Sequence, residues 1–269
     1  MKQSTPPSLF SAKVIKLLSS SSLVTSHTYP KPPKFSAIFG VSFCLSAITT
    51  LAPILENFLD KEIVKSRLVL LAVKPKDFKN ISDHLKELKT DSVIVSLMAG
   101  ISIKKIRELT GHKKLARVMT NINCAYGRAQ SFIYINPACS SKNKKEINNL
   151  FNYVGTVYNL ASEKKIDIVT GLTGSGPAYV LYFLEAMCDI FQKQGFNKKT
   201  SQDLCTNLIE GTINTCKHDK RNIDTIKKSV VSKNGTTEEA LKYMKRSGFK
   251  VILNKAITAA IEKAMKIGA

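Results

Sequence analysis

The sequence predicts an α/β protein in which a sheet of buried, mainly parallel strands is followed by an all-helical region. Three observations predict this class. Continuous apolar runs, typical of strands buried on both faces, recur in the first half of the chain. Helical segments lie between these runs, so the strands need right-handed crossover connections. After about residue 165 only helical periodicity remains.

The sheet elements follow one another closely from residue 65 onward. In chain order we predict a strand over 67–73, a helix opened by Pro75, a strand over 92–96, a short helix over 101–109, and strands over 115–119 and 131–135. The helix after Pro75 has apolar residues at helical spacing, namely Phe78, Ile81, Leu85 and Leu88.

Three apolar stripes at helical spacing predict the C-terminal helices. Pro177 stands where the first helix begins, and Thr200-x-x-Asp203 at the start of the second resembles a capping box. The stripes comprise Val180, Phe183, Leu184, Met187, Cys188 and Phe191, then Leu204, Cys205, Leu208, Ile209 and Thr212, then apolar residues from Phe249 to Met265. Several apolar faces in one helical region favour a bundle that is completed by dimerisation.

The net charge of +21 suggests a polyanionic partner, but its distribution does not support one. Only six of the 41 basic residues are Arg, the residue that reads bases and phosphates by bidentate contacts. The lysines are spread over the whole chain and do not alternate with aromatic residues. We therefore predict no nucleic-acid partner.

The six cysteines form no C-x-x-C pair, and the four histidines do not cluster with them, so no metal site is predicted. Cysteines scattered over apolar stretches indicate reduced core residues and favour the cytoplasm. A mitochondrion or a plastid is the alternative, because the first 55 residues contain no acid and many serines. The uncharged segment Phe35 to Leu55 contains Ser, Thr and Pro, and we predict no membrane span there.

Two segments have compositions that packing alone does not require. The first, Leu71 to Pro75, lies at the carboxyl end of a predicted strand, where open α/β folds bind ligands. An ordinary strand-to-helix turn is the alternative. The second, Thr170 to Tyr179, has three glycines and hydroxyl residues before a predicted helix, so its N–H groups can face an anion or a neighbouring chain. A tight hinge between domains is the alternative.

A third segment is the Val-Ser-Lys-Asn-Gly-Thr-Thr-Glu-Glu run that ends at Glu239. Thr236 and Glu239 have the spacing of a capping box. Ser232, Gly235 and Thr236 would present N–H groups at the helix start, which suits a carboxylate. Thr237 would add a hydroxyl that can donate or accept a hydrogen bond. A plain capped helix is the alternative.

Five segments, in their order along the chain, resemble the pyrroline-5-carboxylate reductase family. They are Ala72 to Pro75, Ala99 to Ile103, Arg117 to Asn121, Gly171 to Tyr179 and Ser232 to Leu241. The Gly-Ser-Gly-Pro-Ala-Tyr and Gly-Thr-Thr runs are the most specific of these. The spacing matches from about Leu68 to the C-terminus.

The resemblance implies a Rossmann-like dinucleotide-binding domain over residues 1–162 and a helical dimerisation and substrate domain over residues 163–269. It implies a homodimer and further a ring of dimers. The implied activity is the reduction of Δ1-pyrroline-5-carboxylate to L-proline, the last step of proline biosynthesis. The implied hydride donor is NADPH, with NADH as the alternative.

The resemblance also implies roles for individual residues. Ser232, Gly235 and Thr236 would bind the substrate carboxylate, and the catalytic Thr237 would both bind substrate and hydrogen-bond its ring nitrogen. The nicotinamide side would be lined by Ala72, Val73, Lys74, Pro75, Leu97, Met98 and Ala99. Hydride transfer to a protonated imine depends on positioning more than on a strong acid.

The match fails over residues 1–55. No glycine precedes Gly40, so the usual glycine-rich phosphate loop has no counterpart, although Ser11 to Leu18 resembles the helix that follows that loop. Asn121-Ile122-Asn123 departs from the family's Asn-Thr-Pro, and Tyr126 replaces a small or aliphatic residue. Two hypotheses follow. One is an active reductase with a divergent first loop. The other is a catalytically weak or inactive relative that serves as an oligomerisation partner or has a wrongly assigned start.

Overall fold

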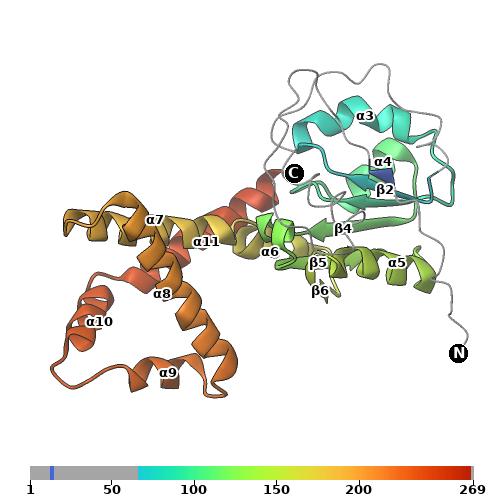
Figure 1. The fold of residues 1–269 in the computed structure, drawn as a ribbon. Helices are drawn as coiled ribbons and strands as arrows, with labels where there is room; N and C mark the ends of the chain where they lie inside the picture. The colour runs from blue at the N-terminus through green and yellow to red at the C-terminus, as the bar shows by residue number, and fades with distance from the viewer. Residues whose placement is uncertain (1–12, 15–65, 268–269) are drawn as a thin grey trace, which may run out of the picture. The chain divides into compact units, whose positions relative to one another are not determined.

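A computed structural model describes residues 13–14 and 66–267 of the chain (Figure 1). The predictions for the phosphate loop, for a targeting segment and for the uncharged segment 35–55 lie outside the described residues. Lys13–Val14 forms strand β1, which pairs in parallel with β2 (Leu68–Leu71). The helix that the resemblance suggested at this position is therefore wrong, and the β-branched Val14 suits a strand better.

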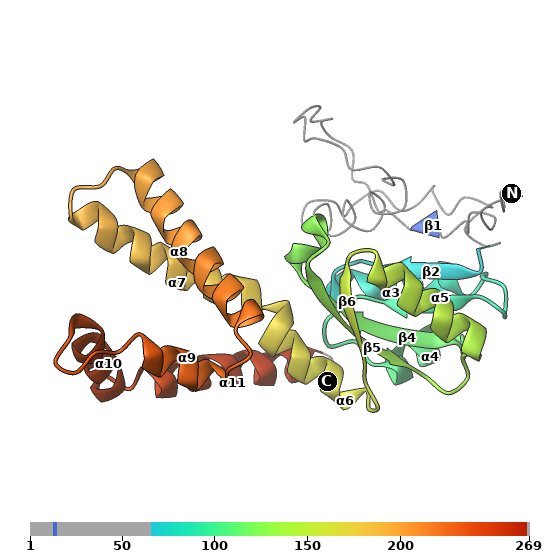
Figure 2. The ribbon, with the colours of Figure 1, turned by 60° about the horizontal axis from the view of Figure 1, so that its bottom comes forward.

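The described residues before the helical region form a six-stranded sheet in the order β1-β2-β3-β4-β5-β6. The further strands are β3 (Val93–Ser96), β4 (Leu115–Met119), β5 (Ala129–Ile135) and β6 (Gly155–Asn159). The first four strands are mutually parallel, whereas β5 is antiparallel to β4 and parallel to β6 (Figure 2). The short 3-10 segment η2 (Ile122–Tyr126) replaces the predicted crossover, because only an antiparallel partner can follow so short a connection.

Helices cover both faces of this sheet. They are η1 (Pro75–Asp77), α3 (Phe78–Leu85), α4 (Ile103–Thr110), α5 (Ser141–Asn152) and α6 (Lys164–Val169). α3 and α4 pack on one face with Leu71 and Ile94, while α5 packs on the other with Leu70 and Val95 (Figure 1). Alternate residues of one strand thus enter two cores, which explains the continuous apolar runs of the sequence.

Local chemistry fixes the helix ends. Ser102 accepts a hydrogen bond from the N–H of Lys105 at the start of α4, and Gly111 ends that helix with a φ of 75°. Ser140 and Asn143 form a capping box at the start of α5. The sequence pattern predicted neither α5 nor β6, because most residues of both elements are exposed or only half-buried and their apolar periodicity is weak.

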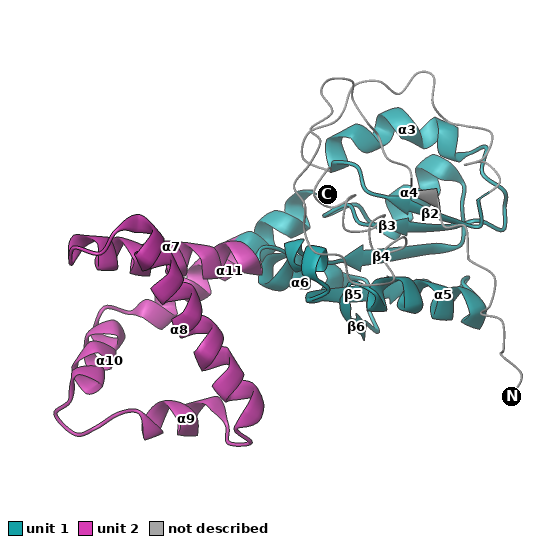
Figure 3. Ribbon diagram, viewed as in Figure 1, with its two compact units in different colours: residues 1–175, 260–269 teal, residues 176–259 magenta. Residues whose placement is uncertain are grey.

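The chain divides into two compact units (Figure 3). Unit 1 comprises residues 1–175 and 260–269, and unit 2 comprises residues 176–259. The helices from residue 176 on are α7 (Gly176–Lys193), α8 (Lys198–His218), α9 (Ile223–Ser229), α10 (Thr236–Arg246) and α11 (Phe249–Ile267). α11 crosses from unit 2 into unit 1.

The helical stripes of the sequence lie largely on the surface of unit 2. Among residues 176–259, all of which the structure describes, only Ser201 and Cys205 are buried. The exposed apolar residues include Val180, Leu181, Phe183, Ile190, Leu204, Leu208, Ile213, Val251, Ile252 and Leu253. Within the described residues, no helix has the length and apolar character needed to cross a bilayer.

Candidate active site

The carboxyl ends of β2 and β3 lie side by side because these strands pair in parallel. The N–H of Leu97 extends the pairing by donating to the carbonyl of Leu71 at 2.9 Å. Ala72 and Val73 after β2, and Ala99 after β3, therefore reach the same edge of the sheet. This is the edge at which parallel α/β sheets bind ligands.

A cavity of about 230 Å³ opens at this edge. Its walls are Ala72 and Val73 after β2, Leu97 and Ala99 after β3, Met119 and Thr120 at the end of β4, and Thr170, Gly174 and Ser175 from the π-helical segment η3 (Thr170–Gly174) and the residue after it. The walls are mostly apolar and carry a few hydroxyl groups. Pockets that enclose a whole small molecule measure roughly 300–1,000 Å³, so this one has the size for one ring of a larger ligand.

The η3 wall is a widened helical turn. The N–H of Ser175 donates to the carbonyl of Thr170, five residues back, at 3.0 Å. Upstream, the Thr170 hydroxyl donates to the carbonyl of Ile166 at 2.8 Å, and the Thr173 hydroxyl donates to that of Val169 at 2.9 Å. These bonds make α6 and η3 one continuous piece of helix. π-turns are rare and are frequent at functional sites.

Two contacts hold η3 against the end of β4. The side-chain amide of Asn121 donates to the carbonyl of Thr173 at 3.1 Å. A Cβ atom on Gly174 would lie 3.0 Å from the sulfur of Met119, so glycine permits this close approach. The sequence left two interpretations of the Thr170 to Tyr179 run open, an anion-facing turn and a hinge. In the structure, Thr170, Gly174 and Ser175 of this run line the cavity, and unit 2 begins at the next residue.

The remaining predicted nicotinamide-side residues lie beside the cavity wall and not in it. Pro75 takes the first position of η1, and the N–H of Asp77 donates to the carbonyl of the exposed Lys74 at 2.9 Å. The side chain of Met98 packs in the core beneath α3 and α4, and its N–H donates to the hydroxyl of Ser96 at 3.2 Å. The cavity wall brings together Ala72, Val73, Leu97 and Ala99.

The predicted carboxylate site lies in unit 2, in the loop before α10. Asn234 has a φ of 57°, in the left-handed region. The N–H of Gly235 donates to the carbonyl of Ser232 at 3.1 Å, which corrects the prediction that this N–H is available to a ligand. A Cβ atom on Gly235 would overlap the Ser232 hydroxyl, so only glycine leaves room for that hydroxyl at this position.

The start of α10 differs from the predicted capping box. Gly235 is the N-cap and Thr236 the first helical residue, and no side chain caps the helix. Glu238, and not Glu239, reaches back and accepts the N–H of Asn234 at 2.6 Å. The prediction is wrong by one residue because glycine is also a favoured N-cap residue, and the sequence pattern alone does not decide between Gly235 and Thr236.

This arrangement leaves donors at the helix start. The N–H groups of Thr236 and Thr237 lie in the first turn, where no helical carbonyl can accept them. A hydrogen bond from Lys242 and the N–H of Asn234 lower the pKa of the Glu238 carboxyl. The loop and the first turn of α10 therefore gather N–H groups and hydroxyls at the positive end of a helix dipole, which favours an anion.

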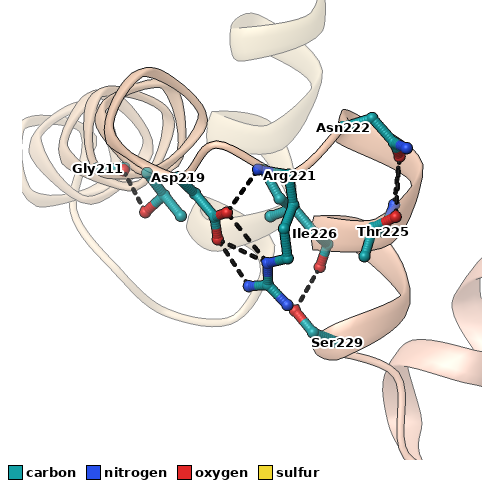
Figure 4. Close-up of polar contacts among 8 residues, drawn as sticks. Gly211, Asp219, Arg221, Asn222, Thr225, Ile226 and Ser229 are labelled. Carbon is teal, nitrogen blue, oxygen red and sulfur yellow. Dashed lines mark hydrogen bonds and ion pairs between the residues drawn. The ribbon is translucent and has the colours of Figure 1, made fainter.

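A rigid turn carries the chain from α8 to α9 and so toward this loop (Figure 4). The carboxylate of Asp219 accepts the N–H of Arg221 at 2.9 Å and its guanidinium at 2.6–3.1 Å. The Arg221 guanidinium and N–H lower the pKa of Asp219 to about 2. The side chain of Asn222 then caps α9 by accepting the N–H of Thr225 at 2.9 Å.

Sequence reasoning missed more than half of the cavity wall. The missed residues are Met119, Thr120, Thr170, Gly174 and Ser175. Met119 is the last residue of a strand that the sequence did predict. The position of that strand's end at the ligand edge was therefore a signal that could have identified Met119. The Thr170 to Tyr179 run was singled out, but its placement depends on a π-turn that has no sequence signature.

Comparisons with known proteins agree with this geometry. A family model described as pyrroline-5-carboxylate reductase dimerisation matches residues 163–267. The chain is 34% identical to the pyrroline-5-carboxylate reductase of Aquifex aeolicus over 75% of this chain and 76% of that one. It is 29% identical to the pyrroline-5-carboxylate reductase of Pisum sativum, over 93% of this chain and 88% of that one. The crystal structure of Plasmodium falciparum pyrroline carboxylate reductase with NADP bound has a TM-score of 0.74 and 25% identity, covering 86% of this chain and 95% of that one.

A largely parallel sheet covered on both faces, with a cavity at the carboxyl ends of its strands, defines an α/β protein of the open-sheet class, which binds ligands at that edge. The match of the family model begins at residue 163, whereas the two compact units divide after residue 175. The chain belongs to the pyrroline-5-carboxylate reductase family.

Proposed function

We propose that this chain reduces Δ1-pyrroline-5-carboxylate to L-proline with hydride from a nicotinamide dinucleotide, the reaction named for its relatives. The observation that carries the proposal is the cavity where the strand ends meet the Thr-Gly-rich turn η3. The two segments with the most specific resemblance to the family are the Gly-Ser-Gly-Pro-Ala-Tyr run, which begins at the last residue of this turn, and the Gly-Thr-Thr run at the start of α10.

The cavity fits a nicotinamide ring. Its aliphatic walls match the faces of a flat ring, and its volume of about 230 Å³ suits one ring and not a whole dinucleotide. The bound dinucleotide would supply the hydride. Ala72, Val73, Leu97 and Ala99 would hold the ring and exclude water, while the hydroxyls of Thr120 and Ser175 offer hydrogen bonds to its polar edge. NADPH is the proposed donor and NADH the alternative.

The substrate is a small anion with a C=N bond. The N–H groups of Thr236 and Thr237 and the hydroxyl of Ser232 would hold its carboxylate at the start of α10. The hydroxyl of Thr237 would hydrogen-bond the ring nitrogen and fix the ring's orientation. Hydride then adds to the carbon of the protonated C=N bond, and the nitrogen keeps its proton in the secondary amine product.

We propose that the working form is a homodimer and that dimers assemble further into a ring. The apolar faces of unit 2 support the dimer, because residues 176–259 bury only Ser201 and Cys205 within one chain. A second copy would cover these faces and supply the missing core. The matched family model describes the same region as a dimerisation domain.

We place the protein in the cytoplasm. The described cysteines are free, and Cys124, Cys139 and Cys205 are buried. Burial raises the pKa of the Cys124 and Cys139 thiols, which keeps them protonated and unreactive. Cell fractionation followed by immunoblotting with an antibody to the native chain tests this placement. Recovery of the chain in a mitochondrial or plastid fraction would contradict it.

Oxidation of NADPH with pyrroline-5-carboxylate, compared between the native chain and Thr237→Ala, tests the activity. We expect Thr237→Ala to lower kcat roughly 100-fold, as loss of one aligned donor does at a reacting centre. Thr206→Ala is the matched control, because Thr206 lies outside the apolar stripe of α8 and its exposed hydroxyl donates to carbonyls of its own helix, those of Gln202 at 2.8 Å and Asp203 at 3.1 Å. A folded, dimeric native chain with no turnover on either dinucleotide would contradict the proposal.

A further inference from the structure

Arg117 is a buried cation in the middle of the sheet. Its side chain on β4 is 2% exposed, and its guanidinium donates to Glu163 Oε1 at 3.1 Å and to Asp167 Oδ1 at 2.7 Å. Its Nε atom is also buried and has no hydrogen-bond partner among the described residues. Apolar side chains of similar volume often stabilise a fold as well as such an ion pair does. The arrangement therefore suggests a role in geometry.

The bond to Asp167 reaches the η3 wall of the cavity. Asp167 lies in α6, which continues directly into η3 through the hydroxyl bonds of Thr170 and Thr173. Fixing Asp167 relative to β4 therefore fixes where Thr170 and the residues after it stand.

The bond to Glu163 reaches a second wall. The same Oε1 atom of Glu163 accepts the N–H of Ile103 at 2.7 Å. Ile103 begins α4 and directly follows the loop that carries Leu97 and Ala99. One carboxylate oxygen thus connects the guanidinium to the connection between β3 and α4.

The third wall is the strand of Arg117 itself. Met119 and Thr120, which line the cavity, follow Arg117 at the end of β4. One guanidinium is therefore connected to three of the four segments that form the cavity wall. The remaining segment, after β2, lies on the far side of β3 in the sheet.

We propose that Arg117 is a positioning residue for the dinucleotide, and that Glu163 and Asp167 transmit its effect to the cavity walls. The inference rests on the proposed function, because it assigns the cavity to the nicotinamide side. It predicts a specific defect: the KM for NADPH rises, while the KM for pyrroline-5-carboxylate, measured at saturating NADPH, changes little.

The test compares three variants in the dimeric enzyme. Arg117→Met removes the charge at similar length, Arg117→Lys keeps the charge, and Arg67→Met is the matched control. Arg67 pairs with Glu146 at 3.1 Å, but its side chain is 57% exposed, and it stands before β2, whereas the cavity lies at the carboxyl end of that strand. We expect Arg117→Met to raise the KM for NADPH roughly ten- to a hundredfold, the range that a misplaced site costs. Arg117→Lys should recover part of this loss, and Arg67→Met should match the native enzyme.

Two further measurements test the positioning role of Arg117 independently of the folding of Arg117→Met and of turnover. If Arg117→Met does not fold, Asp167→Asn and Glu163→Gln take its place, and each should raise the KM for NADPH more than the control does. Direct titration of NADPH binding separates this inference from the proposed function, since it needs no turnover. Lower thermal stability with unchanged NADPH affinity, or equal rises in both KM values, would overturn the positioning role.

Discussion

At the residue scale, Asp219 is held ionised far into the acid range. The guanidinium and N–H of Arg221 lower its pKa from the ordinary 3.8 to about 2. Because the pKa is depressed in the folded chain, the contact stabilises the folded state fully above the unfolded value of 3.8. That contribution is lost as the pH falls from 3.8 through about 2.

Arg221→Ala should raise the pKa of Asp219 from about 2 toward 3.8, because only the backbone N–H of residue 221 is left to lower it. The measurement is a pH titration of the side-chain carboxyl carbon by NMR. Asp224 is an internal control, since hydrogen bonds from Lys227 and Lys228 lower its pKa to about 2 without Arg221. A native Asp219 that titrates at its ordinary pKa would contradict the bidentate contact of Figure 4.

Single residues of the site were predicted from the sequence only in part. Strand ends identify the segment at the ligand edge, and the predicted nicotinamide-side residues Ala72 and Leu97 line the cavity there. Met98, next along the same loop, turns into the core. The apolar pattern of a strand stops at its end, and nothing in the loop's composition tells which side chain faces the ligand.

At the scale of elements, η3 packs beneath the last turns of α11. A Cβ atom on Gly171 would lie 2.6 Å from the backbone nitrogen of Ile261. That approach is closer than any side chain permits, so the two helical segments fit together only with glycine at this position.

Gly171→Ala should lower the free energy of unfolding by about 1–3 kcal/mol, the usual result of overpacking. Gly176→Ala is the matched control, because a Cβ atom there meets nothing within 4 Å. It should leave stability unchanged or raise it by up to about 1 kcal/mol, since alanine favours a helix. Urea denaturation measures the free energy of unfolding of both variants. Equal values for Gly171→Ala and Gly176→Ala would refute the contact between Gly171 and Ile261.

Buried elements were predicted well and exposed ones poorly. The strand at 115–119 has the predicted bounds because all its residues are buried and all but Arg117 are apolar. β6 is mostly exposed, so its composition carries little signal. The cap of α8 was placed at Thr200, whereas Asn197 is the N-cap and accepts the N–H of Thr200 at 2.9 Å. Neighbouring polar residues satisfy the same cap pattern, and only the backbone path decides between them.

At the scale of the whole molecule, unit 2 lacks a core of its own. Its helices expose Leu208 by 53% and Ile252 by 64%, among many other apolar residues. No sequence pattern distinguishes a stripe that packs within the chain from one that packs on a second copy, because both are amphipathic to the same degree.

The melting temperature should therefore depend on protein concentration. If dimerisation supplies the core of unit 2, each tenfold rise in concentration should raise Tm by about 2–4 °C. Differential scanning calorimetry over a hundredfold range measures this, with sedimentation velocity to confirm the dimer. A constant Tm in a chain that sediments as a monomer would contradict the proposed assembly.

The return of α11 into unit 1 also bears on the order in which the protein can fold during synthesis. The sheet is complete once residue 159 has been made, but Gly171 meets Ile261 only after all of unit 2 has left the ribosome. The turn that forms one wall of the cavity thus lacks its packing partner through most of translation. A nascent chain stalled before Ile261 should expose this turn to protease, while the strands, which need only earlier residues, are already protected.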